Sequence, residues 1–351
     1  MIMEKKSDDE LEKRIKAILG DFDPTVPPPK IAAAPEGVNR PTWSVMIPTY
    51  NCAKYLTKTL ESVLEQDPGP EHMQIEVVDD CSTLDDPEKV VREVGKGRVA
   101  FHRNPKNTGY CTLNFNICIQ RSIGHLVHIL HGDDYVLSGF YKEIERLSHT
   151  NPSAALMATR NLCVNEEGAW IFLSQVMPNH VTCSKKSQEF LFGTPIQCAG
   201  VVVKRDFYEA FGAFRPTLVH AADWEMWNRV TQKVGAVVSN NVFAVYRSFD
   251  ANDSGVLSRR ADNLRDFLRL TEIFRQENKD FPYKEAVEHI CNQAITQAQR
   301  FLQIGNSEAA QAAQKIAECL KPAPPKGFAW FLYGLSNFLR RQADKIYSKY
   351  E

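Results

Sequence analysis

The sequence lacks any apolar run long enough to cross a bilayer, which takes about 18 or more apolar residues in a row. Its first residues are charged and contain no apolar signal core. Nine cysteines are present, an odd number, and no two of them form a CxxC pair. This pattern argues against a disulfide framework and against a zinc site, so we expect reduced, mostly buried thiols. The predicted location is the cytoplasm.

An excess of charge of one sign is also missing. The formal net charge is −1, so no broad basic surface is expected, and nucleic acid is not a predicted partner. The chain has no Gly-rich, Lys-bearing phosphate loop near its first predicted strand. Charged ligands must therefore be held by local groups.

What the sequence does contain is apolar material for a large core, 43% of 351 residues. Three regions are predicted. Residues 1–42 are a short charged helix followed by a Pro-rich, extended linker with no core of its own. Residues 43–255 form the main domain, and residues 256–351 form a C-terminal helical region.

In the first half of the main domain, short apolar strands alternate with amphipathic helices. This alternation predicts an α/β fold with a Rossmann-like, mostly parallel sheet that is covered on both faces. We expect Asn51 to cap the first helix and Ser138 to cap the fourth. The predicted strands are 44–47, 75–78, 99–101 and 125–130, and the helices after the first are about 87–94, 110–122 and 138–147.

The second half of the chain is less regular. Strands are predicted at 155–158, 170–173, 196–203 and 237–245, and helices at about 205–211, 222–234, 259–277, 284–303 and 307–320. A last helix, about 327–349, carries an aromatic and aliphatic stripe followed by basic residues. This stripe suits peripheral contact with the inner face of a membrane. The alternative is packing on the helical region or on a second subunit of a homo-oligomer.

Paired acids follow one of the predicted strands. In parallel sheets ligands bind at the carboxyl ends of strands, and Asp133 and Asp134 directly follow the strand 125–130. Adjacent carboxylates repel each other, and Mg²⁺ or Mn²⁺ prefers such oxygen ligands. The two acids therefore indicate a divalent cation site, with an ordinary Asp-rich turn as the alternative.

Two more strands end in polar residues. Asp79 and Asp80 end the second strand, and Pro48-Thr49-Tyr50-Asn51 ends the first. A carboxylate at such a position can accept hydrogen bonds from a base or a ribose, and a tyrosine ring can stack on a base. A turn that caps the following helix is the alternative in both places, and for the first segment both interpretations can hold together.

Taken together, these segments resemble the family 2 glycosyltransferases of the GT-A fold. The resemblance covers about residues 43–250, and both the order and the spacing of the motifs fit. It rests on Ser44-Val-Met-Ile-Pro-Thr-Tyr-Asn51, Glu76-Val-Val-Asp-Asp-Cys-Ser82, Asn107-Thr-Gly109, His128-Ile-Leu-His-Gly-Asp-Asp-Tyr135, Gly200-Val-Val-Val-Lys-Arg205, Phe211-Gly-Ala-Phe214 and Ala222-Asp-Trp-Glu-Met-Trp227.

The resemblance implies a role for each matching residue. Asp223 would be the catalytic base, and Asp133 and Asp134 would bind Mn²⁺ or Mg²⁺ as DxD-type acids. Arg247 matches a position whose basic residue often lies near the diphosphate. The donor nucleotide would be held by Pro48, Thr49, Tyr50, Asn51, Asp80, Asn107, Gly109, Asp133 and Arg247.

The sequence departs from the family pattern at two positions. His131 stands where members often have the first Asp of Asp-x-Asp-Asp, and packing is its preferred interpretation, with a metal or ribose contact as the alternative. Ala222 stands where many members have Glu before the base, so the surroundings of Asp223 are open. His220 is a candidate acceptor contact, and Trp224 is interpreted as a core residue that could reach an acceptor.

The function implied is a metal-dependent, inverting transfer of a sugar from a nucleoside-diphosphate donor, with a UDP-sugar as the first choice. A growing polysaccharide, a lipid-linked glycan or a protein would be the acceptor. Two other classes stay open. One is a non-catalytic carbohydrate-binding or scaffold protein, against which the retained acids argue. The other is a nucleotidyltransferase, against which the missing phosphate loop argues.

Overall fold

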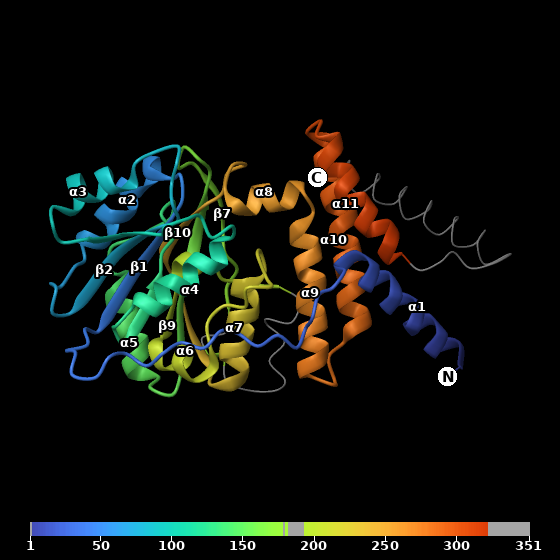
Figure 1. The fold of residues 1–351 in the computed structure, drawn as a ribbon, viewed down its shortest axis with the longest axis horizontal. Helices are drawn as coiled ribbons and strands as arrows, with labels where there is room; N and C mark the ends of the chain where they lie inside the picture. Colours follow the sequence, from blue (N-terminus) through green and yellow to red (C-terminus); the bar gives the residue numbers. More distant parts are fainter. Residues whose placement is uncertain (1, 178–179, 182–192, 322–351) are drawn as a thin grey trace.

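The computed structural model describes residues 2–177, 180–181 and 193–321 (Figure 1). Its first half alternates strands and helices as predicted, because apolar residues recur at helical or strand spacing. In α2 the buried side chains Leu56, Leu60 and Val63 share one face. The elements are α1 (Ile2–Leu19), β1 (Trp43–Thr49), α2 (Ala53–Leu64), β2 (Met73–Asp79), α3 (Pro87–Gly95), β3 (Ala100–Arg103), α4 (Cys111–Arg121), β4 (Leu126–Ile129), β5 (Tyr135–Val136) and α5 (Phe140–Thr150).

The second half adds strands of mixed direction and six more α-helices within the described residues. Here α6, α11 and β7 have the predicted bounds. The elements are β6 (Leu156–Val164), β7 (Trp170–Leu173), β8 (His180–Val181), a 3-10 turn (Cys198–Gly200), β9 (Val201–Lys204), α6 (Arg205–Phe211), α7 (Ala222–Lys233), β10 (Ala236–Arg247), α8 (Asp253–Arg259), α9 (Asp262–Glu277), α10 (Tyr283–Gln303) and α11 (Ser307–Leu320).

The prediction that Asn51 caps α2 is wrong. The N-cap of α2 is Cys52, and Asn51 lies outside the helix with a φ of 50°. Its side-chain Oδ1 accepts hydrogen bonds from the backbone N–H groups of Thr83 and Leu84, at 2.9 and 3.0 Å. A neighbouring loop, which the local sequence does not reveal, supplies these donors. Asn51 therefore joins the ends of β1 and β2 rather than starting a helix.

Two other predicted helix boundaries are wrong. Ser138 does not cap α5, because Gly139 adopts a φ of 95° and α5 begins only at Phe140. The helix predicted at about 259–277 begins only at Asp262, as α9, and the short helix α8 before it was not predicted. They are separated at Ala261, whose φ of 57° breaks the helical path.

The described strands form one 10-stranded sheet in the order β3-β2-β1-β4-β9-β6-β10-β5, with β7 beside β6 and β8 beside β10. Strands β3, β2, β1 and β4 are parallel to one another, which is the predicted Rossmann-like half. Strand β9 runs antiparallel between β4 and β6, and β6 and β10 are again parallel. The parallel half brings the carboxyl ends of β1, β2 and β4 to one edge of the sheet.

Helices cover both faces of the sheet, as predicted. On one face α2, α3 and α5 pack on alternate strand residues such as Val45 and Ile47. On the other face α4, α6 and α7 pack on the intervening positions, including Met46. The period of two along β1 thus divides the core into two layers.

The segment between α1 and β1 is extended, but it does not stand apart from the domain. Ile31 is 5% exposed and belongs to the core cluster that contains α4 and α7. The Pro29 carbonyl accepts a hydrogen bond from Ala213 N at 2.9 Å, and the Ala32 carbonyl accepts one from Arg205 Nη2 at 3.0 Å. The extended segment therefore packs on the core of the main domain, whose start was predicted at residue 43.

Helices α9, α10 and α11 form a bundle beside the sheet domain, with α1 packed against it (Figure 1). Ile15 of α1 is buried there among side chains of α9, α10 and α11. Among the described helices, none is long and apolar enough to span a bilayer. The predicted last helix, about 327–349, lies outside the described residues.

Candidate active site at the carboxyl edge of the sheet

Backbone hydrogen bonds join the ends of β1, β2 and β4. Asp80 N donates to the Thr49 carbonyl at 2.8 Å, and Gly132 N donates to the Pro48 carbonyl at 3.0 Å. A Cβ at position 132 would lie 2.9 Å from the Cys52 Sγ, so only glycine allows this approach. The polar residues after the three strands therefore lie together, as predicted for a ligand site of a parallel sheet.

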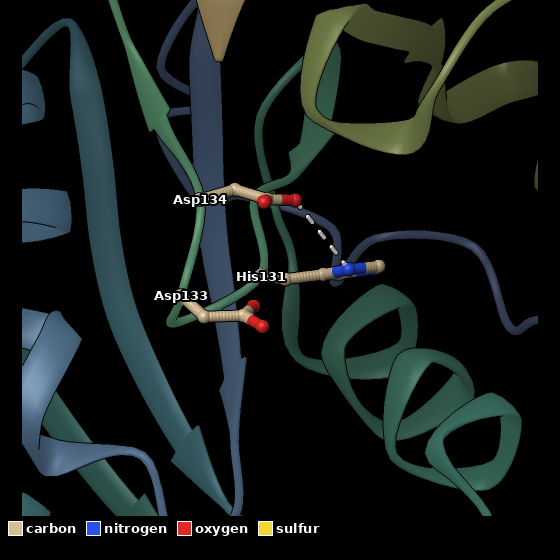
Figure 2. Close-up of side chains that lie close together, drawn as sticks. All are labelled: His131, Asp133 and Asp134. Atoms are coloured by element: carbon tan, nitrogen blue, oxygen red, sulfur yellow. Dashed lines mark ion pairs between the residues drawn. The ribbon is translucent and has the colours of Figure 1, made fainter. Parts of the chain in front are cut away.

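Three side chains after β4 form a group that suits a metal ion. His131, Asp133 and Asp134 offer ligand atoms that all lie within 4.8 Å of one another (Figure 2). His131 Nδ1 lies 3.7 Å from Asp134 Oδ2, and its Nε2 is buried without a hydrogen-bond partner. The ring also stacks on Phe115, with ring centroids 4.8 Å apart. His131 thus packs on Phe115, which agrees with the preferred interpretation of the sequence. It also belongs to the group of potential metal ligands.

The electrostatics of this group favour a bound cation. Burial raises the pKa of Asp133 to about 6, and burial together with the charge of Asp133 raises the pKa of Asp134. Ionisation of both adjacent carboxylates costs free energy, because the like charges repel, unless a positive charge lies between them. Carboxylate oxygens with an imidazole nitrogen are a suitable donor set for Mn²⁺ and also serve Mg²⁺. The residues present therefore fit the predicted metal.

Arg247 fixes the loop that carries the two acids. Its backbone N donates to Asp134 Oδ1 at 2.8 Å, and its Nε donates to the Asp133 carbonyl at 3.1 Å. Its Nη1 donates to the Glu166 carbonyl at 2.7 Å, and its guanidinium lies over the Tyr55 ring. The hydrogen bonds of the guanidinium thus go to backbone carbonyls. Arg247 lies beside Asp133 and orders the acid loop.

Asp80 organises the loop that follows β3. Its carboxylate accepts hydrogen bonds from Asn104 Nδ2 (2.8 Å), Asn107 Nδ2 (3.1 Å) and Thr108 Oγ1 (2.7 Å). The Asn107 Oδ1 accepts a bond from Gly109 N, and Gly109 has a φ of 92°. The predicted donor residues Asp80, Asn107 and Gly109 therefore form one connected unit at the edge of the site.

The segment after β1 presents one side chain to the solvent. Tyr50 is 47% exposed, whereas Thr49 is buried. The Thr49 hydroxyl lies 2.8 Å from the Cys52 Sγ. Pro48 is buried too. Of the four residues predicted to hold a nucleotide here, Tyr50 thus offers a ring for stacking, while Pro48, Thr49 and Asn51 shape the turn.

Asp223 lies in the first turn of α7, where its Oδ1 accepts a hydrogen bond from Trp224 N at 2.6 Å. Burial raises the pKa of Asp223 to about 6, which suits a general base near neutral pH. The charges of Asp223 and Asp134 both raise the pKa of the buried Cys198 thiol, after burial itself. The two carboxylates therefore both lie near this one residue.

The neighbours of Asp223 differ in exposure. Trp224 is 8% exposed and contacts the rings of Phe267 and Phe274, so it is a core residue as preferred. His220 is partly buried, and its ring lies edge-on to Phe267. Burial lowers the pKa of His220. His220 is therefore neutral near pH 7 and can donate or accept one hydrogen bond at the entrance of α7.

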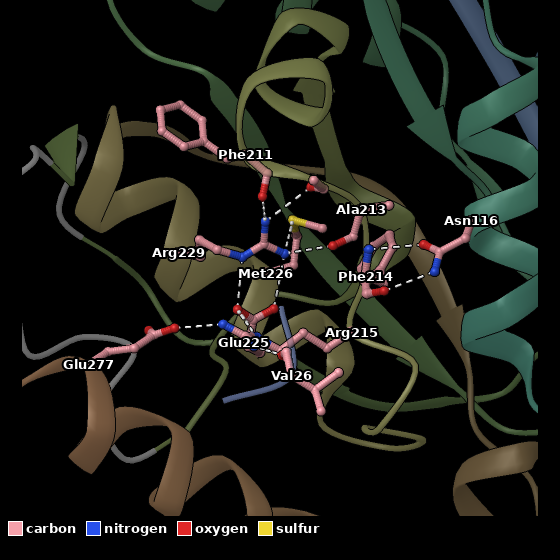
Figure 3. Close-up of polar contacts among 11 residues, drawn as sticks. Val26, Asn116, Phe211, Ala213, Phe214, Arg215, Glu225, Met226, Arg229 and Glu277 are labelled. Atoms are coloured by element: carbon pink, nitrogen blue, oxygen red, sulfur yellow. Dashed lines mark hydrogen bonds and ion pairs between the residues drawn. The ribbon is translucent and has the colours of Figure 1, made fainter. Parts of the chain in front are cut away.

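A network of buried ion pairs is centred on Glu225 of α7 (Figure 3). Glu225 is 1% exposed and bonds to Arg229 Nε at 2.8 Å and Arg215 Nε at 3.2 Å. Arg229 also donates to the carbonyls of Phe211, Gly212 and Ala213, and Arg215 to that of Val26. Glu225 thus fixes α7 to the neighbouring loop through ion pairs. Ala222, at the position where many members of the family have Glu, makes no such contact because it has no polar side chain.

Two contributors were missed in the sequence. Burial raises the pKa of Asp133 and that of Cys111. The charge of Asp253, in the first turn of α8, raises both further. Asn104 is buried between Asp80 and Asn114. No local motif marks either residue, because both reach the site only through the tertiary fold.

The mixed sheet covered by helices on both faces has the GT-A fold. A family model described as "Glycosyl transferase family 2" matches residues 44–211, just under half of the chain. This segment is similar to the family 2 glycosyltransferases.

Similar proteins agree with this assignment. The poly(ribitol-phosphate) beta-N-acetylglucosaminyltransferase TarS of Staphylococcus aureus (strain Mu50) is 32% identical over 94 residues, 27% of this chain and 16% of TarS. The uncharacterized protein MT1568 of Mycobacterium tuberculosis is 26% identical, over 66% of this chain and 75% of its own length. The crystal structure of S. aureus TarS 1-349 in complex with UDP-GlcNAc has a TM-score of 0.51 at 16% identity, over 79% of this chain and 90% of that chain. This likeness confirms the fold, while the aligned part spans well under two thirds of full-length TarS.

Proposed function

We propose that the protein transfers a sugar from a nucleoside-diphosphate sugar to an acceptor hydroxyl, with inversion at the anomeric carbon and with a divalent metal. The observation that carries the proposal is that two carboxylate sites lie near the same buried residue. His131, Asp133 and Asp134 gather after β4. Asp223 in the first turn of α7, whose pKa burial raises to about 6, and Asp134 both act on the Cys198 thiol.

The donor would lie along the carboxyl edge of β1, β2 and β4. Tyr50 would stack on the base, and the loop ordered by Asp80, Asn107 and Gly109 would close against the ribose. We propose a UDP-sugar because the similar S. aureus TarS has been solved with UDP-GlcNAc. Neither the sugar nor the linkage is part of the proposal.

Asp133 and His131 would hold the metal. Asp134 would offer at most its Oδ2, because its Oδ1 already accepts a hydrogen bond from Arg247 N. When bound, Mn²⁺ or Mg²⁺ would neutralise charge on the leaving diphosphate. Arg247 would keep the acid loop in place through the Asp133 carbonyl.

Asp223 would supply the base chemistry. Its carboxylate takes the proton of the acceptor hydroxyl while that oxygen forms the new bond to the anomeric carbon. The bond from this carbon to the diphosphate breaks, and the nucleoside diphosphate leaves with the electron pair. One displacement inverts the carbon and needs no covalent enzyme intermediate. The acceptor would be a glycan, lipid-linked or protein hydroxyl on the α7 side, near His220.

A thermal-shift panel tests donor binding. UDP, UDP-glucose, UDP-N-acetylglucosamine and GDP-mannose would each be added with and without Mn²⁺. A ligand at a hundred times its dissociation constant stabilises the native state by about 2.7 kcal/mol, so binding is readily detected. A Mn²⁺-dependent shift with one nucleotide, followed by its release during transfer to an acceptor glycan, would support the proposal. No shift with any nucleotide would contradict it, and glycan binding without turnover would then indicate a scaffold protein.

A further inference from the structure

Helix α9, which lies beyond the segment matched by the family model, contacts the turn that leads into α7. Asp266 of α9 is fully buried. Its Oδ2 accepts hydrogen bonds from three consecutive backbone N–H groups, those of Val219 (2.8 Å), His220 (2.7 Å) and Ala221 (2.8 Å). These residues directly precede α7, whose N-cap, Ala221, has no side-chain cap of its own.

From this geometry we propose that Asp266 is a positioning residue for the catalytic base, so that α9 forms part of the acceptor side of the active site. The inference rests on the transferase function proposed above. Asp266 thus fixes the turn that leads into α7 from 45 to 47 residues away in the sequence, so the fold and not a local motif brings the carboxylate to these donors. Charge-assisted bonds of this kind are stronger than neutral ones and fix the donor groups in one arrangement.

The neighbouring contacts show that the turn is held from two sides. On the α4 side, Thr112 Oγ1 donates to the Leu218 carbonyl at 2.9 Å. On the α9 side, Phe267 follows Asp266 and packs edge-on against both His220 and Trp224. The backbone of the turn and the side chains on either side of Asp223 are thus fixed by two adjacent residues of α9.

The far end of α9 is anchored to the same helix. Arg215 bonds to Glu225 of α7 and, through its Nη2, to Glu277 at the end of α9 at 2.6 Å (Figure 3). Helix α9 therefore contacts α7 near both ends and cannot shift along it without breaking buried polar contacts. A displacement of the base by about 1 Å is enough to cost a large part of turnover.

The charge of Asp266 also reaches Asp223. After burial, which is the largest cause, Asp266 adds to the raised pKa of Asp223. After burial, the charge of Asp223 in turn adds to the raised pKa of the nearby Cys198 thiol in the 3-10 turn. Loss of the Asp266 charge should therefore lower the pKa of the base, which a purely structural contact would not do.

The test uses Asp266→Asn in the full chain, with Asp262→Asn as its matched control. Asp262 lies on the same helix and pairs with Arg265 three residues later, as Asp266 pairs with Arg269, but its side chain is 33% exposed. The ion pair of Asp262 with Arg265 stays within α9 and does not reach α7. For Asp266→Asn we expect kcat to fall by about tenfold or more while the donor Kd stays within about twofold. The acid limb of the kcat/KM profile should move to lower pH, and Asp262→Asn should match the wild type in all three.

A second variant and a measurement without turnover complete the test. Asp266→Glu keeps the charge but moves the carboxylate, so kcat should fall while the acid limb stays in place. Hydrogen exchange at the amides of residues 219–221 should speed up in Asp266→Asn and not in Asp262→Asn, whether or not a donor is known. Unchanged kcat and pH profile in a merely less stable Asp266→Asn protein would overturn the inference, as would unchanged exchange at these amides. Absence of transfer by the wild-type protein would instead contradict the proposed function.

Discussion

At the scale of single residues, the proposed acid–base chemistry depends on Asp223. Its Oδ1 is bound to Trp224 N, and burial raises its pKa to about 6. The carboxylate is therefore mostly ionised at pH 7 but still basic enough to accept a proton from a hydroxyl group. No stronger base than this is needed where the leaving diphosphate departs with the electron pair.

Replacing Asp223 with Asn should cut transfer by about a hundredfold or more, because the general base is lost. Donor binding should persist, since Asp223 lies on α7 and not on the strand edge that would hold the nucleotide. In the wild type, transfer should decline as the pH falls through about 6, when the carboxylate of Asp223 becomes protonated. Steady-state rates from pH 5 to 8 and nucleotide titrations of both proteins would check this. Near-normal turnover by the Asn variant would remove Asp223 from the mechanism.

His131 should distinguish Mn²⁺ from Mg²⁺. An imidazole nitrogen suits Mn²⁺ better than Mg²⁺, which prefers oxygen ligands. His131→Ala should therefore weaken Mn²⁺ binding by roughly tenfold or more and affect Mg²⁺ much less. Titration of free Mn²⁺ by electron paramagnetic resonance measures this without turnover. His125→Ala is the control, since His125 is exposed just before β4; equal Mn²⁺ affinity in both variants would show that His131 only packs on Phe115.

The identity of the site acids could be predicted from their position after strands, but their partners could not. Asp133, Asp134 and Asp223 each follow or begin a regular element, and the motifs that contain them are local. The contacts of Asp80 with Asn104 and Thr108, and of Asp266 with the turn before α7, join residues far apart in the chain. Such contacts leave no period or spacing in the sequence, because only the tertiary fold brings them together.

At the scale of elements, amphipathic period and short apolar runs predicted most helices and strands to within a few residues. The errors have a common cause. Asn51 and Ser138 looked like local helix caps, and α9 was predicted to start at about 259, where α8 ends in the structure. In the structure other features set these boundaries. Asn51 bonds to a neighbouring loop, Gly139 has a positive φ before α5, and Ala261 has a left-handed conformation before α9. The antiparallel insertion of β9 between β4 and β6 is likewise a matter of long-range pairing.

Helix α7 should depend on Glu225 for its stability. Glu225→Gln leaves Arg215 and Arg229 without their shared anion, and uncompensated buried charge of this kind costs roughly 3–5 kcal/mol. Glu93→Gln is the control: Glu93 also pairs with a basic residue four positions away, Lys89, but both side chains are more than half exposed. Exposed pairs contribute only about 0–1 kcal/mol. Urea denaturation of both variants would measure the difference, and similar losses would show that the network in Figure 3 contributes little.

At the scale of the whole molecule, the extended N-terminal segment, the sheet domain and the helical bundle share one core. A single apolar cluster contains Ile31, Met46 of β1, Trp224 of α7 and Phe274 of α9. Arg215 adds polar contacts to all three regions through Val26, Glu225 and Glu277. The three regions are separable in the sequence but continuous in packing, so the helical bundle should not unfold alone.

Calorimetry should therefore show one unfolding transition for the sheet domain and helices α9 to α11. Phe274→Ala removes a buried ring from the shared cluster and should lower the stability of the whole by roughly 3–5 kcal/mol, still in one transition. Leu302→Ala is the control, because Leu302 lies in the same bundle but is 59% exposed, and it should change stability by less than about 0.5 kcal/mol. The ratio of calorimetric to van't Hoff enthalpy should stay near that of the wild type in both. A separate transition at lower temperature in Phe274→Ala, with nucleotide binding retained at temperatures above it, would show that the bundle is an independent unit. Such a result would also weaken the case that α9 holds the catalytic base, because the base could then keep its place without that helix.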